Sequence, residues 1–369
     1  MPTQTLQTYG SAIGRWVGIG PYYAMFPTAF AERVILEYTD PGHVVLDPFS
    51  GRGTAVFAAG AHDRHGIGVE INPVGYVYTR AKLRPAHPAA VERRIAELAG
   101  NAWRFRKAAD DLPEFFHHCY APAVREFLLT ARNWLDWRKS HIDCTVAALL
   151  LVHLHGKRTD SFSNQMRQTK AMSPPYAVRW WTDKRFVPPD LDPVGFLRKK
   201  LAWRYAKGRP RLRESRVFLG DSVSRLGHVT KTLSALGNKR VYLLLTSPPY
   251  CGITNYHYDQ WLRLWLLRGP NVPTVPTGPH QGKFVDRKAY ADMLETVFVS
   301  AAGLMDPAGV IYVRTDHRAP TLQATIHALQ TAFPKKHMRK LRRPSPRRTQ
   351  TDLFGGKSGN EGEVDLVLT

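Results

Sequence analysis

The tetrapeptide Ser-Pro-Pro-Tyr occurs twice in the chain, at residues 173–176 and at residues 247–250. Each copy combines a hydroxyl and backbone carbonyls, which accept hydrogen bonds, with two stiffening prolines and an aromatic ring. The second copy follows the apolar run Val241–Leu245. This run predicts a buried parallel strand that delivers the tetrapeptide to the carboxyl edge of a sheet, where chemistry is commonly placed.

The first copy has different neighbours. It follows residues 167–172, a polar and basic stretch without a strand pattern, which predicts a loop or a helix start whose first turn is set by proline. The nearby Trp180, Trp181, Trp203 and Tyr205 lie among basic residues. They could belong either to helix cores or to a nucleic-acid surface. We therefore expect the chemistry at the second copy.

A cofactor loop is expected far upstream. The short apolar strand Val44–Asp47 runs into a glycine-containing turn that ends at Thr54, and glycine lets a backbone approach a ligand closely. About twenty residues further on, the strand Gly66–Glu70 ends in a carboxylate. This spacing is typical of dinucleotide-type folds, in which such a carboxylate accepts hydrogen bonds from ribose hydroxyls.

Together, Asp47–Thr54 and Thr246–Tyr250 resemble the amino-group DNA methyltransferases that use S-adenosylmethionine. The Ser-Pro-Pro-Tyr form is similar to the cytosine-N4 enzymes of that family, whereas the adenine-N6 enzymes more often carry Asp or Asn first. Phe26 and Pro27 resemble the segment that closes over the methionine end of the cofactor. Asp221 resembles the carboxylate that faces its adenine.

The resemblance implies two sets of site residues. The cofactor-binding set is Phe26, Pro27, Asp47, Pro48, Phe49, Ser50, Gly51, Gly53, Thr54, Glu70, Asp221 and Thr246. The catalytic set is Ser247, Pro248, Pro249 and Tyr250. The Ser247 hydroxyl and the Pro248 carbonyl are expected to accept hydrogen bonds from the amine, and Tyr250 to stack on a base flipped out of the duplex.

Covalent catalysis by Cys251 is not expected. Cytosine-C5 methyltransferases place a cysteine nucleophile directly after proline, and here Tyr250 intervenes. The three cysteines are widely spaced and odd in number, which predicts a reduced, cytoplasmic protein with no disulfide framework and no zinc site.

The charge predicts a polyanionic partner. The formal net charge is +22 and the isoelectric point about 10.1, which implies binding with a steep salt dependence; the family resemblance implies that the partner is double-stranded DNA. No apolar run approaches the roughly 18 residues of a membrane span, and no secretory signal is visible. Phosphate contact is expected from a basic cluster near the C-terminus, formed by Arg339, Lys340, Arg342, Arg343, Arg347 and Arg348.

The chain is expected to form an α/β, Rossmann-like methyltransferase fold with a mainly parallel twisted sheet and a terminal antiparallel hairpin. Residues 1–84 would hold the cofactor, and residues 85–213, with apolar positions at helical spacing, would form a mostly helical insertion suited to DNA recognition. Residues 214–369 would carry the catalytic half. The hairpin strands are expected near residues 337–341 and 364–368.

Three alternatives stay open at this point. The acceptor could be adenine N6, or an amino group on RNA, because RNA guanine methylases share similar strand ends. The chain could also be a non-catalytic DNA-binding protein that retains the fold. A restriction endonuclease is a candidate partner, while the sequence leaves the oligomeric state and the target sequence undetermined.

Overall fold

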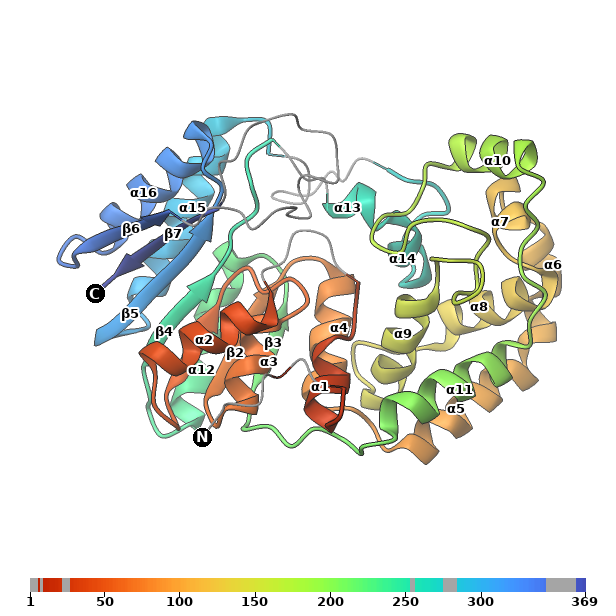
Figure 1. The fold of residues 1–369 in the computed structure, drawn as a ribbon, viewed down its shortest axis with the longest axis horizontal. Coiled ribbons are helices and arrows are strands. Elements are labelled where there is room, and N and C mark those ends of the chain that lie inside the picture. The colour runs from red at the N-terminus through yellow and green to blue at the C-terminus, as the bar shows by residue number, and fades with distance from the viewer. Residues whose placement is uncertain (1–5, 7–8, 22–26, 253–255, 275–283, 343–362) are drawn as a thin grey trace.

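The computed structural model describes residues 6, 9–21, 27–252, 256–274, 284–342 and 363–369. A seven-stranded sheet lies on one side of the molecule and a group of helices on the other (Figure 1). The strand order is β3-β2-β1-β4-β5-β7-β6. The strands are β1 (Val44–Asp47), β2 (His65–Glu70), β3 (Arg216–Leu219), β4 (Val241–Thr246), β5 (Met305–Thr315), β6 (Met338–Arg342) and β7 (Val364–Leu368).

The strands β1 to β5 pair in parallel, and β7 pairs antiparallel with both β5 and β6. The predicted Rossmann-like α/β fold, with its mainly parallel sheet and terminal antiparallel hairpin, is therefore confirmed. The chain moves outward from β1 to β2 and β3, then returns to place β4 on the other side of β1. Such a reversal of strand order opens a crevice at the carboxyl ends of the two central strands, where ligands bind in folds of this type.

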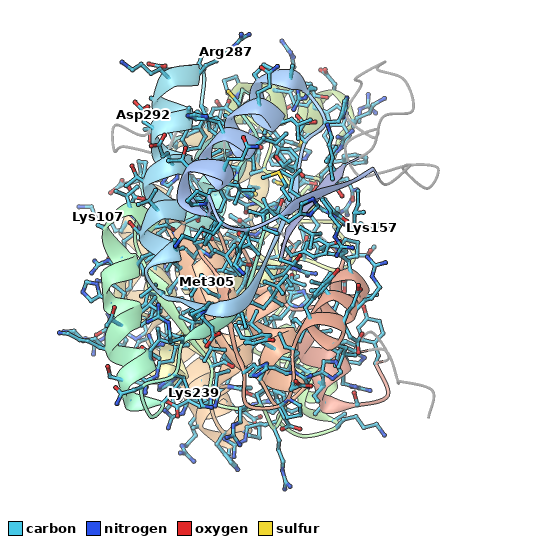
Figure 2. All side chains as sticks on the ribbon, turned by 90° about the vertical axis from the view of Figure 1, so that its left-hand side faces the viewer. Lys107, Lys157, Lys239, Arg287, Asp292 and Met305 are labelled. Carbon is cyan, nitrogen blue, oxygen red and sulfur yellow. The ribbon has the colours of Figure 1, made fainter. Side chains whose placement is uncertain are left out.

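Alternating residues of the strands pack against helices on the two faces of the sheet. Val44 and Leu46 face one apolar cluster, and Val45 faces another, as the two-residue repeat of a strand requires. The first cluster includes residues of α12 (Ser222–Ala235), α15 (Arg287–Ala302) and α16 (Ala319–Ala332), and the second includes residues of α2 (Thr28–Tyr38) and α3 (Thr54–Ala61). Figure 2 shows Arg287 and Met305 at different heights, because α15 descends beside the sheet before β5 begins.

The segment between β2 and β3 is mostly helical, as the sequence predicted. After α4 (Pro73–Leu83), its elements are α5 (Pro88–Gly100), the 3-10 helix η1 (Ala102–Phe105), α6 (Arg106–Asp110), α7 (Glu114–Cys119), α8 (Pro122–Trp134), α9 (His141–His153), α10 (Pro174–Asp183) and α11 (Pro193–Tyr205). Its apolar core also includes residues of α1 (Ala12–Val17), α4 and α14 (Trp261–Leu266). The helical segment is thus packed directly on the helix that follows the second tetrapeptide.

Within the described ranges, no helix is both long enough and apolar enough to cross a bilayer.

Candidate active site

The ends of β1 and β4 meet through a buried hydrogen bond. The Thr246 hydroxyl donates to Asp47 Oδ1 over 2.7 Å, although the two residues are 199 positions apart in sequence. Thr246 has no exposed surface and Asp47 is almost completely buried. This contact joins the glycine loop to the strand that leads into the second Ser-Pro-Pro-Tyr.

Asp47 is held in an apolar environment. Burial raises the pKa of its carboxyl to about 7, although the hydrogen bonds from Thr246 and from the Phe49 backbone N–H oppose the shift. A carboxyl that titrates near neutrality at a strand end is a feature often found in functional sites, although structural networks produce it as well.

The glycine loop needs glycine at two positions. Gly51 and Gly53 have φ angles of +53° and +69°, a region that side chains with a Cβ rarely adopt. A Cβ on Gly53 would also lie 2.3 Å from the Cγ2 of Thr79. The loop therefore passes close to α4, with its backbone held in one conformation at the edge of the sheet.

Glu70 at the end of β2 fixes this loop. Its Oε2 accepts a hydrogen bond from the Gly51 N–H at 2.5 Å, and its Oε1 accepts one from the Asn72 N–H at 2.8 Å. Glu70 thus fixes the backbone of the glycine loop at the end of β2.

The end of β3 is tied to the same loop. Asp221 caps α12 by accepting a hydrogen bond from the Val223 N–H at 3.1 Å, and the adjacent Ser222 hydroxyl donates to the Pro48 carbonyl. Ser50 contacts β2, since its N–H donates to the Val69 carbonyl at 3.0 Å. Four predicted cofactor residues, Asp47, Pro48, Ser50 and Asp221, therefore lie along three neighbouring strand ends.

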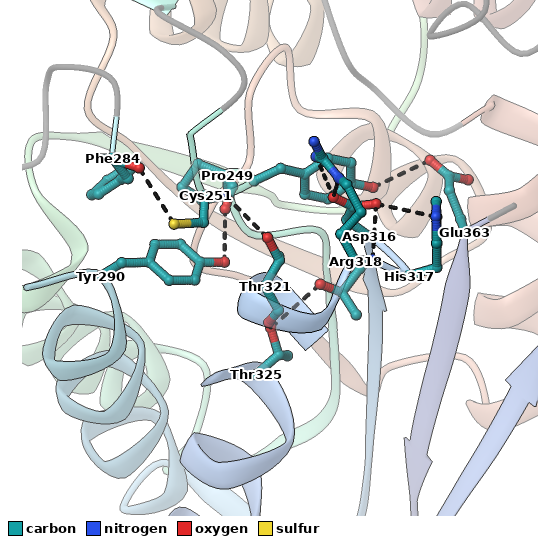
Figure 3. Close-up of polar contacts among 12 residues, drawn as sticks. Pro249, Cys251, Phe284, Tyr290, Asp316, His317, Arg318, Thr321, Thr325 and Glu363 are labelled. Atoms are coloured by element: carbon teal, nitrogen blue, oxygen red, sulfur yellow. Dashed lines mark hydrogen bonds and ion pairs between the residues drawn. The ribbon is translucent and has the colours of Figure 1, made fainter. Parts of the chain in front are cut away.

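The second tetrapeptide is anchored at its proline end and beyond it (Figure 3). The Tyr290 hydroxyl donates to the Pro249 carbonyl at 2.9 Å, and the Cys251 N–H donates to the Thr321 hydroxyl at 3.2 Å. Pro248 is buried and Ser247 is half-buried. No residue in the described part of the chain donates to the Ser247 hydroxyl or the Pro248 carbonyl.

Tyr250 is fixed by residues that the sequence reasoning missed. Its hydroxyl donates to Glu363 Oε1 at 3.2 Å, and Glu363 Oε2 lies 3.3 Å from Arg314 Nη1. Arg314 also donates two hydrogen bonds to Asp365, of 2.7 and 3.0 Å. Arg314 and Asp365 interrupt otherwise apolar strands, and such buried charges must be paired; this was the signal that could have revealed the network.

The side chain of Glu363 is partly buried and has acidic as well as basic neighbours. Burial raises the pKa of Glu363 above its ordinary value, and Arg314 and the Tyr250 hydroxyl oppose that change. Asp316, at the end of β5, contributes to raising it and itself pairs with His317 and Arg318, which Figure 3 shows beside Glu363.

The first tetrapeptide lies elsewhere. Ser173 is the N-cap of α10 and the two prolines form the first turn of that helix, as predicted. Tyr176 is half exposed, whereas Trp181 is fully buried. The aromatic residues near this copy are therefore partly core and partly surface. Trp203 belongs to the surface, where it packs on Tyr9 and Arg15.

The remaining predicted residues are peripheral or lie outside the described part of the chain. Pro27 is the exposed N-cap of α2, and Phe49 and Thr54 border the glycine loop. Arg339 and Lys340 are exposed on the outermost strand β6, where charged side chains also protect a sheet edge from pairing. Phe26, Arg343, Arg347, Arg348 and the side chain of Arg342 are outside the described residues.

A hollow of about 210 Å³ separates the start of α4 from the segment after the second tetrapeptide. It is lined by Pro73 on one side and by His257 and Trp261 on the other. Burial lowers the pKa of His257. The segment after the second tetrapeptide thus faces the start of α4.

The family comparison matches only the N-terminal part of the chain. Residues 4–79 match the N6/N4 methyltransferase family model, described as DNA methylase. This segment contains the glycine loop and Glu70, and ends well before the second tetrapeptide.

Curated relatives match over short segments. Type II methyltransferase M.Cfr9I from Citrobacter freundii is 44% identical over 54 residues, or 15% of this chain and 18% of that protein. Type II methyltransferase M.HpaI from Haemophilus parainfluenzae is 44% identical over 52 residues, 14% of this chain and 17% of that protein. DNA adenine methyltransferase YhdJ from Escherichia coli is 48% identical over 46 residues, 12% and 16% of the two chains. The chain thus matches less than a fifth of the length of each relative.

Among solved structures, the rRNA methyltransferase aviRa from Streptomyces viridochromogenes aligns with a TM-score of 0.35 and 14% identity, over 98% of this chain and 96% of that one.

The sequence matches support an amino-group DNA methyltransferase. They include proteins named as type II methyltransferases and one named as a DNA adenine methyltransferase.

Proposed function

We propose that this protein transfers a methyl group from S-adenosylmethionine to the exocyclic amine of a base in DNA, namely N4 of cytosine. The observation that carries the proposal is the hydrogen bond between Thr246 and Asp47. This bond joins the glycine loop to the strand that leads into the second tetrapeptide, and the reversal of strand order beside it is where ligands bind in folds of this type.

The residues at the strand ends fit this cofactor. The carboxylate of Glu70, at the end of β2, is proposed to bind the ribose hydroxyls, and that of Asp221, after the neighbouring strand β3, to face the adenine. The backbone between Asp47 and Thr54 approaches closely because Gly51 and Gly53 adopt positive φ angles. S-adenosylmethionine, when bound, supplies an electrophilic methyl group. Phe26 and Pro27 are proposed to cover its methionine end.

The tetrapeptide would activate a poor nucleophile. The lone pair of an exocyclic amine is delocalised into the base, so the amine must be held in line with the methyl group, and positioning of this kind supplies roughly 7 to 11 kcal/mol. The Ser247 hydroxyl and the Pro248 carbonyl would accept hydrogen bonds from the two amine protons. Because the prolines and the Tyr290 contact immobilise the loop, both acceptors are preorganised.

Tyr250 would hold the base. A base in a duplex hides its amine, so it must be flipped into the site, and stacking on an aromatic ring offsets part of the unstacking cost. The hydrogen bond to Glu363 fixes the orientation of the Tyr250 ring. The net charge of +22 supports a polyanionic substrate such as double-stranded DNA.

The test is product identification. Purified protein is incubated with labelled S-adenosylmethionine and either DNA or RNA, and the nucleic acid is hydrolysed for mass analysis. We expect N4-methylcytosine in DNA. N6-methyladenine would assign the same site to adenine, as the YhdJ match would favour. Label found only in RNA, or in neither polymer, would overturn the proposal.

A further inference from the structure

One polar loop of the helical segment is built as a rigid surface. This loop, residues 156–169 between α9 and α10, carries the basic residues Lys157, Arg158 and Arg167 and the acidic Asp160. Asp160 is already paired with Lys200 of α11. Lys157 and Arg158 are exposed, and neither forms an ion pair within the described residues.

Hydrogen bonds between side chains and the backbone hold this polar loop in place. Asn164 has no exposed surface, and its side-chain amide donates to the carbonyls of His118 at 3.0 Å and Phe186 at 2.9 Å. Gly156 and Gln165 form a parallel bridge, and the Gln165 side chain accepts a hydrogen bond from the Arg158 N–H at 3.0 Å. A loop fixed in this way loses little conformational entropy when it binds.

The polar loop is also joined to the segment that follows the catalytic tetrapeptide. Arg263 of α14 is fully buried and donates to the carbonyls of Gln168 and, at 2.9 Å, Leu151. Gln260 Nε2 donates to the Thr169 carbonyl at 3.3 Å. Just beyond the loop, Lys170 pairs with Asp259 at 2.7 Å. Figure 1 shows the yellow-green loop beside α14, with α13 (Tyr256–Asp259) just before that helix.

A hollow of about 680 Å³ opens along this loop. Most of the residues that line it carry polar or charged side chains; they are Gly156, Lys157, Asp160, Gln165, Met166, Arg167, Gln168 and Thr169. Arginine and lysine donate to guanine edges, and glutamine pairs with adenine edges, in the major groove. The loop therefore offers both donors and acceptors on a concave surface that is held in a fixed position.

We propose that the polar loop reads base edges of the duplex next to the methylated base, and so sets the target sequence. This inference rests on the proposed function. The link through Arg263 holds the reading surface at a constant position relative to the segment after the catalytic tetrapeptide. A double-stranded DNA substrate suits it better than a protein partner, because the exposed and unpaired side chains of Lys157 and Arg158 are cationic.

The experiment measures where methyl groups are placed. Wild-type protein, Lys157→Ala and Arg158→Ala are each expressed in a bacterial host without base methylation, and the genomic DNA is sequenced by a method that detects methylated cytosine and adenine. Lys107→Ala is the matched control, because Lys107 is also an exposed lysine of the helical segment. Figure 2 shows Lys107 and Lys157 on opposite sides of the molecule.

We expect Arg158→Ala to reduce discrimination against sites with one mismatched base by about tenfold, within the range for loss of one base contact. Lys157→Ala should relax a position of the target sequence as well, and Lys107→Ala should leave the target unchanged. An unchanged site preference in both loop variants would overturn the inference, as would a uniform loss of methylation at all sites, which indicates phosphate contact alone. A wild-type protein that methylates no DNA base would instead contradict the proposed function.

Discussion

The two copies of Ser-Pro-Pro-Tyr are identical in sequence and opposite in structure. At residues 173–176 the tetrapeptide begins helix α10, where the prolines occupy the first turn and the Ser173 side chain caps no backbone N–H. At residues 247–250 it extends from a buried parallel strand, and its tyrosine is held by a charged network. The same four residues therefore serve as a helix start in one place and as a candidate active-site loop in the other.

This difference teaches that the neighbours decide the role of the motif. The apolar strand β4 pairs with β1 and brings Thr246 against Asp47, whereas the polar residues before Ser173 form no strand. Proline suits both settings, because it stiffens a loop and also fits the first turn of a helix. The comparison can be tested by making the same change in both copies.

The largest difference is expected for the serines. Ser247→Ala should lower the rate of methyl transfer by about 100- to 1000-fold, as loss of one preorganised hydrogen-bonding group does in other enzymes. Ser173→Ala should change the rate by less than about twofold, because surface substitutions of this kind have small effects. Single-turnover rates with labelled cofactor measure both. A larger loss in Ser173→Ala than in Ser247→Ala would reverse our assignment of the two copies.

The tyrosines should differ next. Tyr250→Ala removes a stacking surface worth about 1 to 3 kcal/mol per base, so we expect turnover to fall roughly 5- to 150-fold while cofactor affinity stays within about twofold. Tyr176→Ala alters a half-exposed side chain and should leave both quantities unchanged. Turnover and calorimetric cofactor binding are measured on the same preparations. Equal losses in the two variants would contradict a special role for Tyr250.

The network around Tyr250 allows a finer test. Tyr250→Phe keeps the ring and removes the hydroxyl, and Glu363→Ala removes the carboxylate that accepts its hydrogen bond. Each change should lower kcat about 5- to 13-fold, in line with about 1 to 1.5 kcal/mol for a hydrogen bond. The double variant should resemble either single variant, because both remove the same interaction. Additive losses would show that Glu363 acts independently of Tyr250.

The last prediction concerns the pH dependence of stability rather than turnover, at the Asp47 carboxyl that accepts a hydrogen bond from Thr246. The folded-state pKa of Asp47, about 7, exceeds its unfolded value near 4, so the folded state binds the proton more tightly. Its contribution to stability is complete below pH 4 and is lost as pH rises toward 7, by about 1 kcal/mol per pH unit. Asp47→Asn should abolish this slope in denaturant unfolding measured from pH 4 to pH 8. An unchanged slope would mean that Asp47 ionises freely in the folded protein.

Most of the fold could be predicted from local patterns. The apolar runs ending at Asp47, Glu70 and Thr246 became parallel strands, because burial on both faces of a sheet requires such runs. The terminal hairpin was predicted at residues 337–341 and 364–368, and β6 and β7 lie at residues 338–342 and 364–368. Helical spacing likewise predicted the helices between β2 and β3.

The hydrogen bond that holds Tyr250 could not be predicted from local patterns. Glu363 is 113 positions from Tyr250 in sequence, and it reaches the site because β7 inserts antiparallel between β5 and β6. Arg263 was part of an apolar helical pattern in sequence, yet the structure places it at the base of the polar loop. Neither role has a local signal, since each depends on which elements pack together.

By itself, the sequence determined the element types, the glycine loop and the two places where Ser-Pro-Pro-Tyr could act. These features arise from residues close together in the chain, whose backbone preferences and apolar repeats operate locally. Only the tertiary structure decided that Thr246 meets Asp47, that Glu363 holds Tyr250, and that the polar loop is fixed to α14. The physical reason is that strand order and helix packing bring together distant residues, whose buried polar groups must then find partners in one another.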